Sequence, residues 1–574
     1  MPSEWPLGEW TPGRLLAVLD IGKSNAKLLL LDPLSGEELA LRQKPNAPRE
    51  DGPLRQLDLP GLEDWLLRTL AGLPERSRIA AILPVAHGAA AVLLDDDGEP
   101  LLAPDYEDPV LSEEDAAYEA LRAPFGATLS PALPAGLNLG RQIHFVQRRL
   151  PGVFARTAAI LPYPQYWAHR LCGVAASEVT SLGCHTDLWQ PAQARFSGMA
   201  LRQGWERLFP PLRPAGAVLG RLRPALAARC GLPGDCAVLC GLHDSNASYL
   251  AHLTHRAAAE PFAVVSSGTW TVLMARGTPA SALRPERDML ANVDVWGGLV
   301  GTARFMGGRE YRAVAGPDAP PPGEEGLFQA LDEGACVLPG FAGGGAFPGR
   351  HGVILRAEGL DGAGRSALAS LYLALLTDLS LDLLRAAGDV VVDGPLARNP
   401  LYPALLAALR PGSRLLRCRD SAGPVAGARC LVLGRKAPPP VLDEIPPPPG
   451  RSGSAWRAGT GGGPWRPSRR PGREMWPFPP GTASPASCPN PPLPRHRAGW
   501  PDPPPWKRWH GRNSCTPAWH PAPNCLASPA GGGQPAPWRF RTDLRGQQEW
   551  GTPPDQDFLR PRTILHRTKQ RRKT

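Results

Sequence analysis

The sequence predicts an α/β protein made of two similar halves, followed by a C-terminal tail of different composition. Near the N-terminus, an apolar strand, a turn at Gly22 and a second apolar strand form the hairpin-like segment RLLAVLDIGKSNAKLLLLD. From about Pro261 the same order of strand, small polar turn and strand returns in PFAVVSSGTWTVLMARG. Strand-like and helix-like segments follow each hairpin, which is typical of α/β domains. Two halves that open alike indicate two lobes with a ligand between them.

The first half is expected to span residues 14–249. After its hairpin come apolar strands, predicted at Ile79–Val85 and Ala89–Leu94. Helices are predicted around Leu62–Leu70 and Gln142–Arg149. These elements together predict one α/β domain.

The second half is expected to span residues 257–440. Its hairpin is followed by a glycine-rich stretch at 340–349, a long apolar helix, a strand and a further helix. The last three are predicted at Arg365–Ala387, Asp389–Val392 and Asn399–Arg410. The second half is therefore also predicted to form an α/β domain.

Residues 451–574 differ from the rest of the chain in composition. They hold 24 of the 70 prolines and 9 of the 17 tryptophans, with no hydrophobic periodicity. Proline and glycine at this density do not sustain helix or sheet, so we expect a disordered tail. Such a tryptophan content is unusual for a disordered linker, and out-of-frame translation of GC-rich coding sequence is the preferred explanation. A functional disordered extension and a Pro-rich interaction arm stay open as alternatives.

The charge of the chain is also divided unevenly. The tail carries 21 Lys and Arg against 6 Asp and Glu, which leaves 42 against 47 for residues 1–450. The mild acidity of the body is typical of a soluble metabolic enzyme, and we expect no nucleic-acid partner for it. Nucleic-acid binding through the Arg and Trp residues of the tail is the weakest alternative.

Cysteines and apolar runs favour a cytoplasmic protein. Eight of the eleven cysteines lie in the body without the paired short spacings of a zinc site or a disulfide framework, so reduced thiols are expected. The N-terminus lacks a basic segment followed by an apolar stretch, and no apolar run approaches the roughly 20 residues that span a bilayer. No membrane association is expected.

The first hairpin turn has the composition of a phosphate-binding turn. Its residues are Asp20, Ile21, Gly22, Lys23, Ser24 and Asn25. Backbone N–H groups, a hydroxyl and an amide in such a turn can point at one phosphate, and Lys23 or Lys27 can add charge. An ordinary hairpin turn with a capping Asp is the alternative for this motif taken alone.

The second hairpin turn is also small and rich in hydroxyl groups. Ser267, Gly268 and Thr269 follow Ser266 there. A plain tight turn is again the alternative, but two matched turns are much less expected by chance. The sequence thus predicts a phosphate held by both hairpins.

These segments resemble those of the FGGY carbohydrate kinases. DIGKSNAKL and SSGTW resemble the first and second phosphate motifs of the superfamily of actin, Hsp70 and the sugar kinases, and VVVDGPLARNP resembles its adenosine motif. CGLHDSNASYL resembles the segment with the catalytic aspartate, as it stands in the rhamnulose and fuculose kinase branch. Further resemblance lies in LPYPQYWAHRLCG, EVTSLGCHTDLW, ARFMGGRE and SAGPVAGARCLVLG.

The resemblance implies roles for individual residues. Asp244, expected in a short loop, would be the catalytic base and contact the sugar, and His87 in AILPVAHGAAAVLL would be a second sugar contact. Asp20 would organise Mg²⁺ and its waters. Nucleotide contacts would come from the two turns and from Gly394 and Asn399. A capping role for Asp244 and a structural role for His87 are the alternatives from residue type alone.

The family implies two RNase-H-like domains with an interdomain cleft, together with ATP and Mg²⁺. The implied activity is phosphorylation of a hydroxyl of a ketose, deoxyketose or polyol, with sugar and ATP as partners; the sugar and the oligomeric state stay open, a homodimer being allowed. Pro395 stands where the family usually has a second glycine, and it removes a backbone donor. A catalytically weakened sugar or nucleotide sensor on the same fold is therefore the alternative function.

Overall fold

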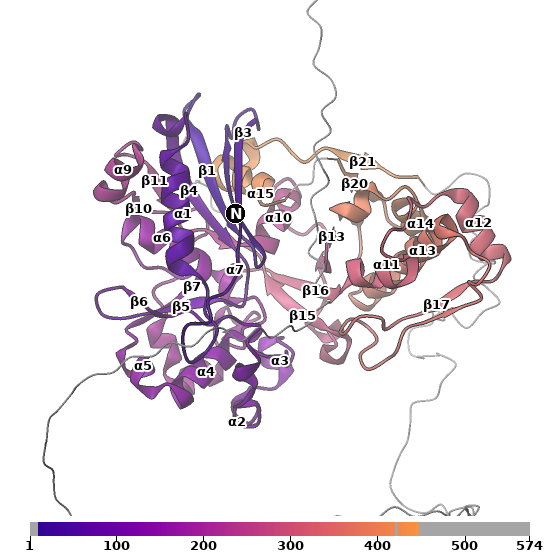
Figure 1. Ribbon diagram of the computed structural model, residues 1–574, viewed down its shortest axis with the longest axis horizontal. Coiled ribbons are helices and arrows are strands. Elements are labelled where there is room, and N and C mark those ends of the chain that lie inside the picture. The colour runs from indigo at the N-terminus through magenta and orange to yellow at the C-terminus, as the bar shows by residue number, and fades with distance from the viewer. Residues whose placement is uncertain (1–9, 420–422, 447–574) are drawn as a thin grey trace, which may run out of the picture. The chain divides into compact units, whose positions relative to one another are not determined.

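The computed structural model describes residues 10–419 and 423–446 of the 574-residue chain (Figure 1). The tail expected at 451–574 lies outside the described residues. The domain limits 14–249 and 257–440 stay predictions. One large sheet lies within the first region, and a second lies within the other region except for its last strand, at 442–444.

The first large sheet is built on the predicted N-terminal hairpin. Its strands lie in the order β10-β11-β4-β1-β2-β3, and β12 also pairs with β4. Their bounds are β1 Leu15–Ile21, β2 Asn25–Leu31, β3 Glu38–Pro45, β4 Ile79–Ala86, β10 Val218–Arg221, β11 Ala237–Leu239 and β12 Leu242–His243. Every residue of β1 is buried, as expected for a continuous apolar run at the centre of a sheet.

The second large sheet repeats this arrangement. Its order is β15-β16-β14-β13-β19-β20-β21. The bounds are β13 Phe262–Ser267, β14 Thr271–Arg276, β15 Met289–Val293, β16 Leu299–Phe305, β19 Asp389–Asp393, β20 Leu415–Cys418 and β21 Leu442–Glu444. Both predicted hairpins are therefore confirmed.

The two sheets share one topology around their hairpins. β1 pairs antiparallel with β2 and parallel with β4, and β13 pairs antiparallel with β14 and parallel with β19. Next to the hairpin, a third strand pairs antiparallel with its second strand: β3 with β2 in the first sheet, and β16 with β14 in the second. On the other side, one more strand pairs in parallel: β11 with β4, and β20 with β19. This repeated order is the RNase-H-like arrangement that the sequence resemblance implied.

Smaller strand pairs lie outside the two large sheets. β5 pairs with β6 and β7, β8 with β9, and β17 with β18. Their bounds are β5 Ala91–Leu94, β6 Pro100–Leu102, β7 Ala159–Pro162, β8 Trp189–Gln190, β9 Arg195–Phe196, β17 Cys336–Leu338 and β18 Val353–Leu355. The strand predicted at Ala89–Leu94 is thus β5, in a separate three-stranded sheet.

Helices of the first half follow local signals in the sequence. α1 (Leu59–Ala71) begins after Asp58, whose side chain accepts a hydrogen bond from Gly61 N, and its leucines recur on one buried face. The others are α2 Asp115–Leu121, α3 Phe125–Thr128, α4 Leu139–Arg149, α5 Pro151–Arg156, α6 Tyr163–Cys172, α7 Val179–Leu182, α8 Gly198–Gln203 and α9 Pro224–Cys230.

Helices of the second half surround the long helix α13. They are α11 Gly307–Ala315, α12 Glu324–Asp332, α13 Gly362–Leu383 and α14 Tyr402–Leu409. By length and composition α13 could cross a membrane, but 72% of its most apolar window is buried inside the structure, as in a core helix of a folded domain. The helix predicted from Asn399 begins only at Tyr402, because Asn399 accepts the Leu401 and Tyr402 N–H groups with its side chain.

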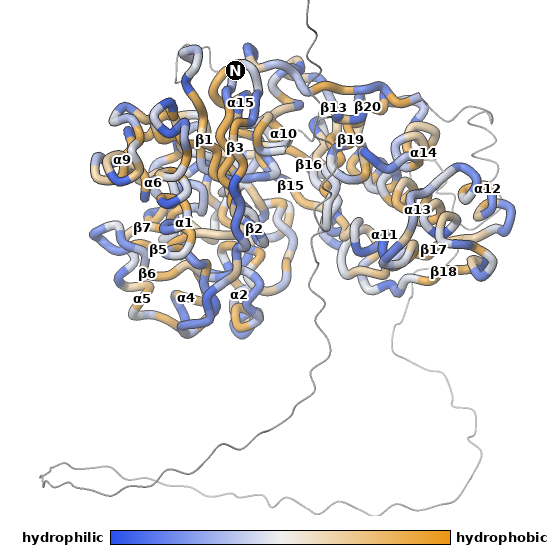
Figure 2. The backbone as a smooth tube through the Cα atoms, turned by 45° about the horizontal axis from the view of Figure 1, so that its top comes forward, coloured by the Kyte–Doolittle hydropathy of each residue, from blue (hydrophilic) through white to orange (hydrophobic). Residues whose placement is uncertain are grey.

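Two further helices, α10 (Asp244–Leu253) and α15 (Gly423–Leu433), pack against each other. Their buried residues join one hydrophobic core with residues of both large sheets, such as Val18 and Val264. In Figure 2 the hydrophobic colour is concentrated along the central strands and inner helices, and the hydrophilic colour on peripheral loops. α10 is therefore held by packing on both sheets.

Candidate functional site

Three predicted site residues meet at the carboxyl ends of neighbouring strands in the first sheet. Asp20 is in β1, His87 follows β4, and Asp244 follows β12. The register pairs Ile21 with Ala86, and Ala86 with His243, so the three positions are adjacent across the sheet. Carboxyl ends of parallel strands are the usual ligand-binding edge of an open α/β sheet.

Asp20 is a buried carboxylate with a second carboxylate nearby. Its relative exposure is 7%, and Lys27 Nζ lies 3.7 Å from its Oδ2. Burial, followed by the charge of Asp244, raises the pKa of Asp20 to about 6, although Lys27 offsets part of this rise. Asp20 is therefore in a position where a bound cation would stabilise its ionised form.

His87 is buried beside two tyrosine rings. The ring centroids of Tyr106 and Tyr163 lie 5.5 and 5.3 Å from its own, and its backbone N–H donates to Ile21 O. Nδ1 contacts Gly88 O at 2.9 Å, whereas Nε2 has no hydrogen-bond partner among the described residues. Burial lowers the pKa of His87, so the ring is neutral near pH 7 and can offer Nε2 to a polar ligand.

Asp244 is the first residue of α10, so the expectation of a short loop was wrong. Its Oδ1 accepts hydrogen bonds from Ser245 N at 2.6 Å and Ser245 Oγ at 3.2 Å. The side chain keeps 30% of its surface exposed. The carboxylate therefore lies in the first turn of the helix, held by its contacts with Ser245.

His243 connects Asp244 to a buried cysteine. Its Nε2 lies 3.2 Å from Asp244 Oδ1 and 3.6 Å from Cys184 Sγ. Burial alone would favour the neutral forms of this pair, but nearby charges prevail: His185 and then His243 lower the pKa of Cys184 to about 5, and Cys184 and then Asp244 raise the pKa of His243 to about 9. The pair is thus a thiolate and an imidazolium near pH 7.

The neighbouring Asn246 can accept a hydrogen bond from a protonated His243 ring if its amide oxygen and nitrogen are exchanged. As placed, Asn246 Nδ2 lies 3.2 Å from His243 Nδ1, while the buried Asn246 Oδ1 has no partner among the described residues. Amide oxygen and nitrogen are assigned from hydrogen bonding, and exchanging them lets Oδ1 accept the Nδ1–H of a protonated ring. The same change satisfies a buried acceptor.

The first hairpin turn is closed by a backbone hydrogen bond, and its lysine is paired with an acidic residue. Gly22 N donates to Asn25 O at 2.9 Å, and Ser24 and Asn25 are exposed. Lys23 forms an ion pair with buried Asp105, lies 3.5 Å from Glu107 and stands over the Tyr106 ring. Its ammonium is therefore held on the first half, and a phosphate role for Lys23 would require it to leave this pairing.

The second hairpin turn borders a cavity of about 180 Å³ next to α10. The lining residues that matter here are Ser266, Ser267 and Gly268 from the hairpin and Ser245 and Ser248 from the helix. Thr269 lies in the same turn and is exposed. The structure thus brings the second turn close to the residue that follows Asp244.

The predicted adenosine motif is joined to this turn through Ser267. Its Oγ donates to Asp393 O at 2.6 Å and accepts from Leu396 N at 2.9 Å. Gly394 has a φ of +81°, and a Cβ there would overlap Ser267 O, so only glycine fits. Pro395 begins the 3₁₀ helix Pro395–Arg398, where its missing N–H costs little.

Asn399 has a structural use in this motif. Its Oδ1 accepts from two backbone N–H groups at the start of α14, and its Nδ2 donates to Ser370 Oγ at 3.0 Å. Both ends of the amide are therefore engaged, and a direct nucleotide contact by Asn399 stays a prediction.

Sequence reasoning named neither Cys184 nor His243 as a site residue. Both lie in segments that carried the family resemblance, EVTSLGCHTDLW and CGLHDSNASYL. The sequence showed each of them beside a polar motif, but it did not show that they touch, because 59 residues of chain separate them. Pairings of this kind depend on the fold and not on local pattern.

Comparisons with known proteins show which families this chain resembles. The family profile described as "Carbohydrate kinase FGGY, C-terminal domain" matches residues 259–440. L-fuculokinase of Haemophilus influenzae is 30% identical over 141 residues, which is 24% of this chain and 28% of that protein. The chain thus matches little more than a quarter of that curated relative.

Solved structures extend the similarity over both halves. A carbohydrate kinase from Novosphingobium aromaticivorans is 39% identical with a TM-score of 0.69, covering 76% of this chain and 95% of that one. A xylulose kinase from Lactobacillus acidophilus is 13% identical with a TM-score of 0.64, over 78% and 96% of the two chains, and shares the fold. The profile match and the identity over nearly the whole Novosphingobium protein show that this chain belongs to the FGGY carbohydrate kinase family.

Proposed function

We propose that the chain transfers the γ-phosphoryl group of ATP to a hydroxyl of a sugar. The observation that carries this proposal is the meeting of Asp20, His87 and Asp244 at adjacent strand ends, with the small-residue turn at Gly268 bordering a cavity beside Ser245. The strand ends of the first sheet would supply side chains for proton transfer and sugar contact. The turn at Gly268 in the second sheet would let phosphate oxygens approach closely.

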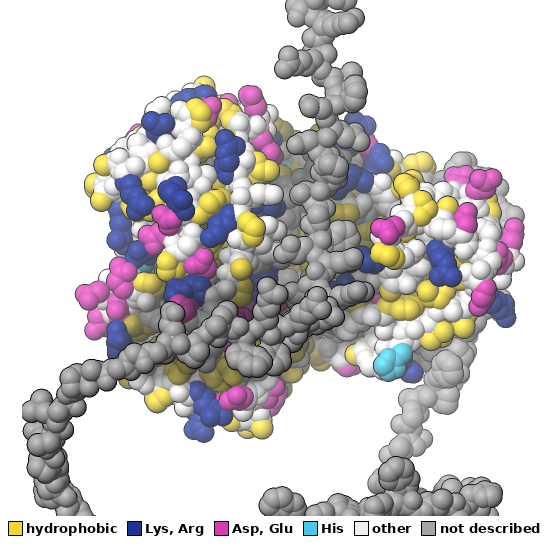
Figure 3. Space-filling model, viewed as in Figure 1, with side chains coloured by type: hydrophobic (Ala, Val, Ile, Leu, Met, Phe, Trp, Pro, Cys, Tyr) yellow, Lys and Arg dark blue, Asp and Glu magenta, His cyan; other side chains and the backbone are white. Residues whose placement is uncertain are grey.

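The proposed substrate class is a ketose or deoxyketose, with a polyol less favoured. The similarity to L-fuculokinases supports a deoxyketose of the fuculose kind, and the His-Asp pair at 243–244 supports the same branch. Figure 3 shows basic and acidic side chains on both halves of the visible face, which does not favour a polyanionic partner. A cytoplasmic location is part of the same proposal.

In the proposed mechanism Asp244 is the general base. As the sugar oxygen attacks phosphorus, its proton passes to a carboxylate oxygen of Asp244, the new P–O bond forms and the bond to the ADP oxygen breaks. The Ser245 contacts fix Oδ1 at the start of α10. His87 Nε2 supports sugar binding as a hydrogen-bond partner inside an otherwise aromatic environment.

His243 is proposed as a positioning residue for Asp244. Its imidazolium forms an ion pair with Asp244, Nε2 lying 3.2 Å from Oδ1, and Cys184 supplies the opposite charge that keeps the ring protonated. This ion pair limits the rotation of the Asp244 carboxylate. His243 therefore acts through Asp244 and is not assigned a contact with substrate.

The residues present fit a bound Mg²⁺ at Asp20. This carboxylate is buried, its pKa is raised by burial and by Asp244, and hard cations prefer carboxylate and water oxygens. When bound, the ion would supply charge neutralisation for the phosphates. Lys27, 3.7 Å from Asp20, would compete with it for the same oxygen.

The test is an ATP-consumption screen of the full chain against ketoses, deoxyketoses and polyols, run in parallel with Asp244→Asn. Sugar-dependent ADP release that is lost in the variant is the expected result. Binding of both ATP and a sugar without turnover in the parent would instead support the sensor function. Turnover that survives in Asp244→Asn would remove the base assignment while leaving the kinase assignment intact.

A further inference from the structure

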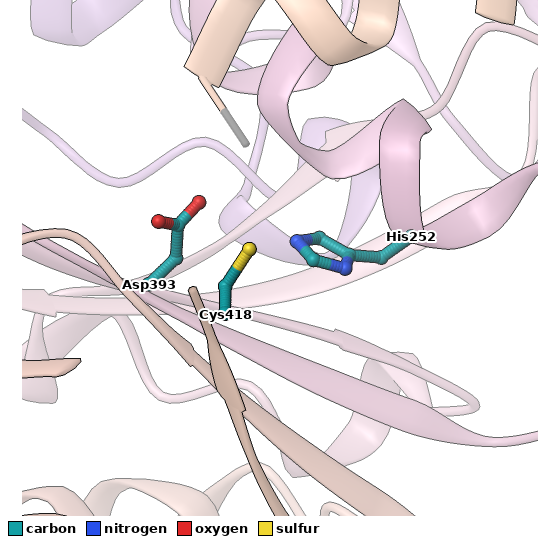
Figure 4. Close-up of side chains that lie close together, drawn as sticks. All are labelled: His252, Asp393 and Cys418. Carbon is teal, nitrogen blue, oxygen red and sulfur yellow. The ribbon is translucent and has the colours of Figure 1, made fainter. Parts of the chain in front are cut away.

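A second cluster of chemically reactive side chains contains none of the residues assigned to the proposed kinase site. It consists of His252 on α10, Asp393 at the end of β19 and Cys418 at the end of β20 (Figure 4). Their exposed fractions are 4%, 3% and 4%. One nitrogen, one carboxylate oxygen and one sulfur lie within 4.8 Å of one another.

The fold explains why these residues meet. β19 and β20 are parallel neighbours with Val392 paired to Arg417, so Asp393 and Cys418 are the next positions along both strands. α10 packs over this edge through the core that joins it to both sheets. In Figure 4 the His252 ring extends toward the Cys418 sulfur, with the Asp393 carboxylate on the other side of it.

His252 is the member that most needs a ligand. Both of its ring nitrogens are buried and have no hydrogen-bond partner among the described residues. Buried polar groups in folded proteins are nearly always paired, so two unpaired nitrogens on one ring call for an explanation. A bound ion between the imidazole, the thiol and the carboxylate provides one.

We propose that His252, Asp393 and Cys418 form a binding site for Zn²⁺ or a similar borderline-soft divalent cation. Zn²⁺ takes sulfur, nitrogen and carboxylate oxygen ligands at about 2.0–2.3 Å, which is this donor set. Mg²⁺ prefers oxygen ligands and would not select an imidazole and a thiolate. Small side-chain rotations would close the present spacing, and a water would complete a tetrahedral site.

The bound ion would connect elements that matter for the proposed kinase site, although the site does not depend on that function. His252 lies on the helix that begins at Asp244, and Asp393 precedes Gly394. Zn²⁺ would therefore tie the first residue of α10, through its helix, to the turn after β19. We expect the ion to be structural in effect.

The experiment uses the full chain, stripped with a chelator and titrated with Co²⁺ and then Zn²⁺. The expected result for the parent is one bound Co²⁺ with a near-ultraviolet thiolate charge-transfer band and strong visible bands of a tetrahedral ion, all displaced by Zn²⁺. Cys418→Ser should abolish the thiolate band. Its Zn²⁺ affinity should fall at least about 100-fold, since even outer partners of a metal site contribute about 10- to 100-fold.

Two further variants make the result decisive. His252→Gln should weaken Zn²⁺ binding to a similar extent, whereas Cys230→Ser, a buried thiol bonded to Leu67 O, should behave as the parent. The tail cysteines Cys488, Cys515 and Cys525 are shared by every variant, so only differences between variants count. A parent without stoichiometric binding, or Cys418→Ser and His252→Gln variants that keep parental affinity, would overturn the proposal.

Discussion

The two large sheets have the same strand order but end in different chemistry. The strand ends of the first carry Asp20, His87 and, after β12, Asp244, whereas the hairpin turn and strand ends of the second carry Ser267, Gly268 and Gly394. In the first half, Asp20 and His87 are buried, and burial together with neighbouring charges shifts their pKa values. In the second half, backbone and hydroxyl groups approach closely because side chains are small or absent. Under the proposed function, one framework would serve proton transfer at one copy and anion binding at the other.

The largest effect is expected at Asp244, which holds the proposed chemistry of the first half. Asp244→Asn keeps the shape but cannot accept a proton, so kcat should fall about 10²- to 10⁴-fold with sugar and ATP affinities retained. Paired steady-state kinetics and calorimetry measure both quantities. Turnover within about threefold of the parent would place the chemistry elsewhere.

Next in size is the effect of Asp20 on stability. Its folded pKa of about 6 lies above the unfolded value of 3.8, so the folded state holds the proton more tightly and the free energy of unfolding falls as pH rises from about 4 to about 6. Asp20→Asn should therefore stabilise the metal-free protein at pH 7 by up to about 3 kcal/mol, two pKa units being worth about 1.4 kcal/mol each.

Denaturant unfolding of the parent and the Asp20→Asn variant at pH 7 and pH 4 checks this, and the difference should vanish at the lower pH. Asp96→Asn, at an exposed position, is the matched control and should change stability little. An Asp20→Asn variant less stable than the parent at pH 7 would show that the Lys27 pairing outweighs burial.

Ser267 probes the second half in the same way. Ser267→Ala leaves Leu396 N–H and Asp393 C=O without their hydroxyl partner, and the free energy of unfolding should fall by about 2 kcal/mol. Ser266→Ala, one residue earlier and lining the same cavity, is the control for the loss of a hydroxyl. Equal effects of the two variants would show that the two hydrogen bonds of the Ser267 hydroxyl add no particular stability.

A glycine variant tests close approach without disturbing the fold. A Cβ at Gly268 would meet Trp270 O at 3.7 Å, an ordinary contact, so Gly268→Val should fold normally but narrow the cavity. ATP affinity should weaken about tenfold, with an unchanged melting temperature. Gly412→Val, where a Cβ meets nothing within 4 Å, is the control. Unchanged ATP affinity in Gly268→Val would remove this turn from the phosphate site.

The smallest effect at neutral pH is expected from Cys184→Ser. Without the thiolate, the pKa of His243 should drop from about 9, because its nearest attractive charge is lost. The alkaline fall of kcat/KM should then begin about one pH unit lower, an opposite charge being worth about 1–3 units. A purely structural role would lower activity equally at every pH. Cys230→Ser should leave the profile unchanged.

Sequence pattern predicted the framework well because hairpins and apolar strands are local. The hairpins at 15–31 and 262–276, and the strand at 389–393, were found nearly at their observed bounds. The start of α10 was missed because HDSNASYL lacks an apolar periodicity, so the helix begins at Asp244 where a loop was expected. Partners such as Asp105 for Lys23 were beyond reach, since 82 residues separate them. A basic residue in a turn predicts a positive charge there, but not which acidic side chain forms the ion pair with it.

The hydroxyl bridge of Ser267 bears on how fast a nucleotide can associate. The turn after β13 and the start of the 3₁₀ helix after Gly394 are already tied together before any ligand arrives. Little chain entropy then has to be lost at these two segments during the encounter. We therefore expect the observed association rate to rise linearly with nucleotide concentration, without the plateau that a slow ordering step would impose. Stopped-flow measurements with a fluorescent nucleotide would show which shape the curve takes.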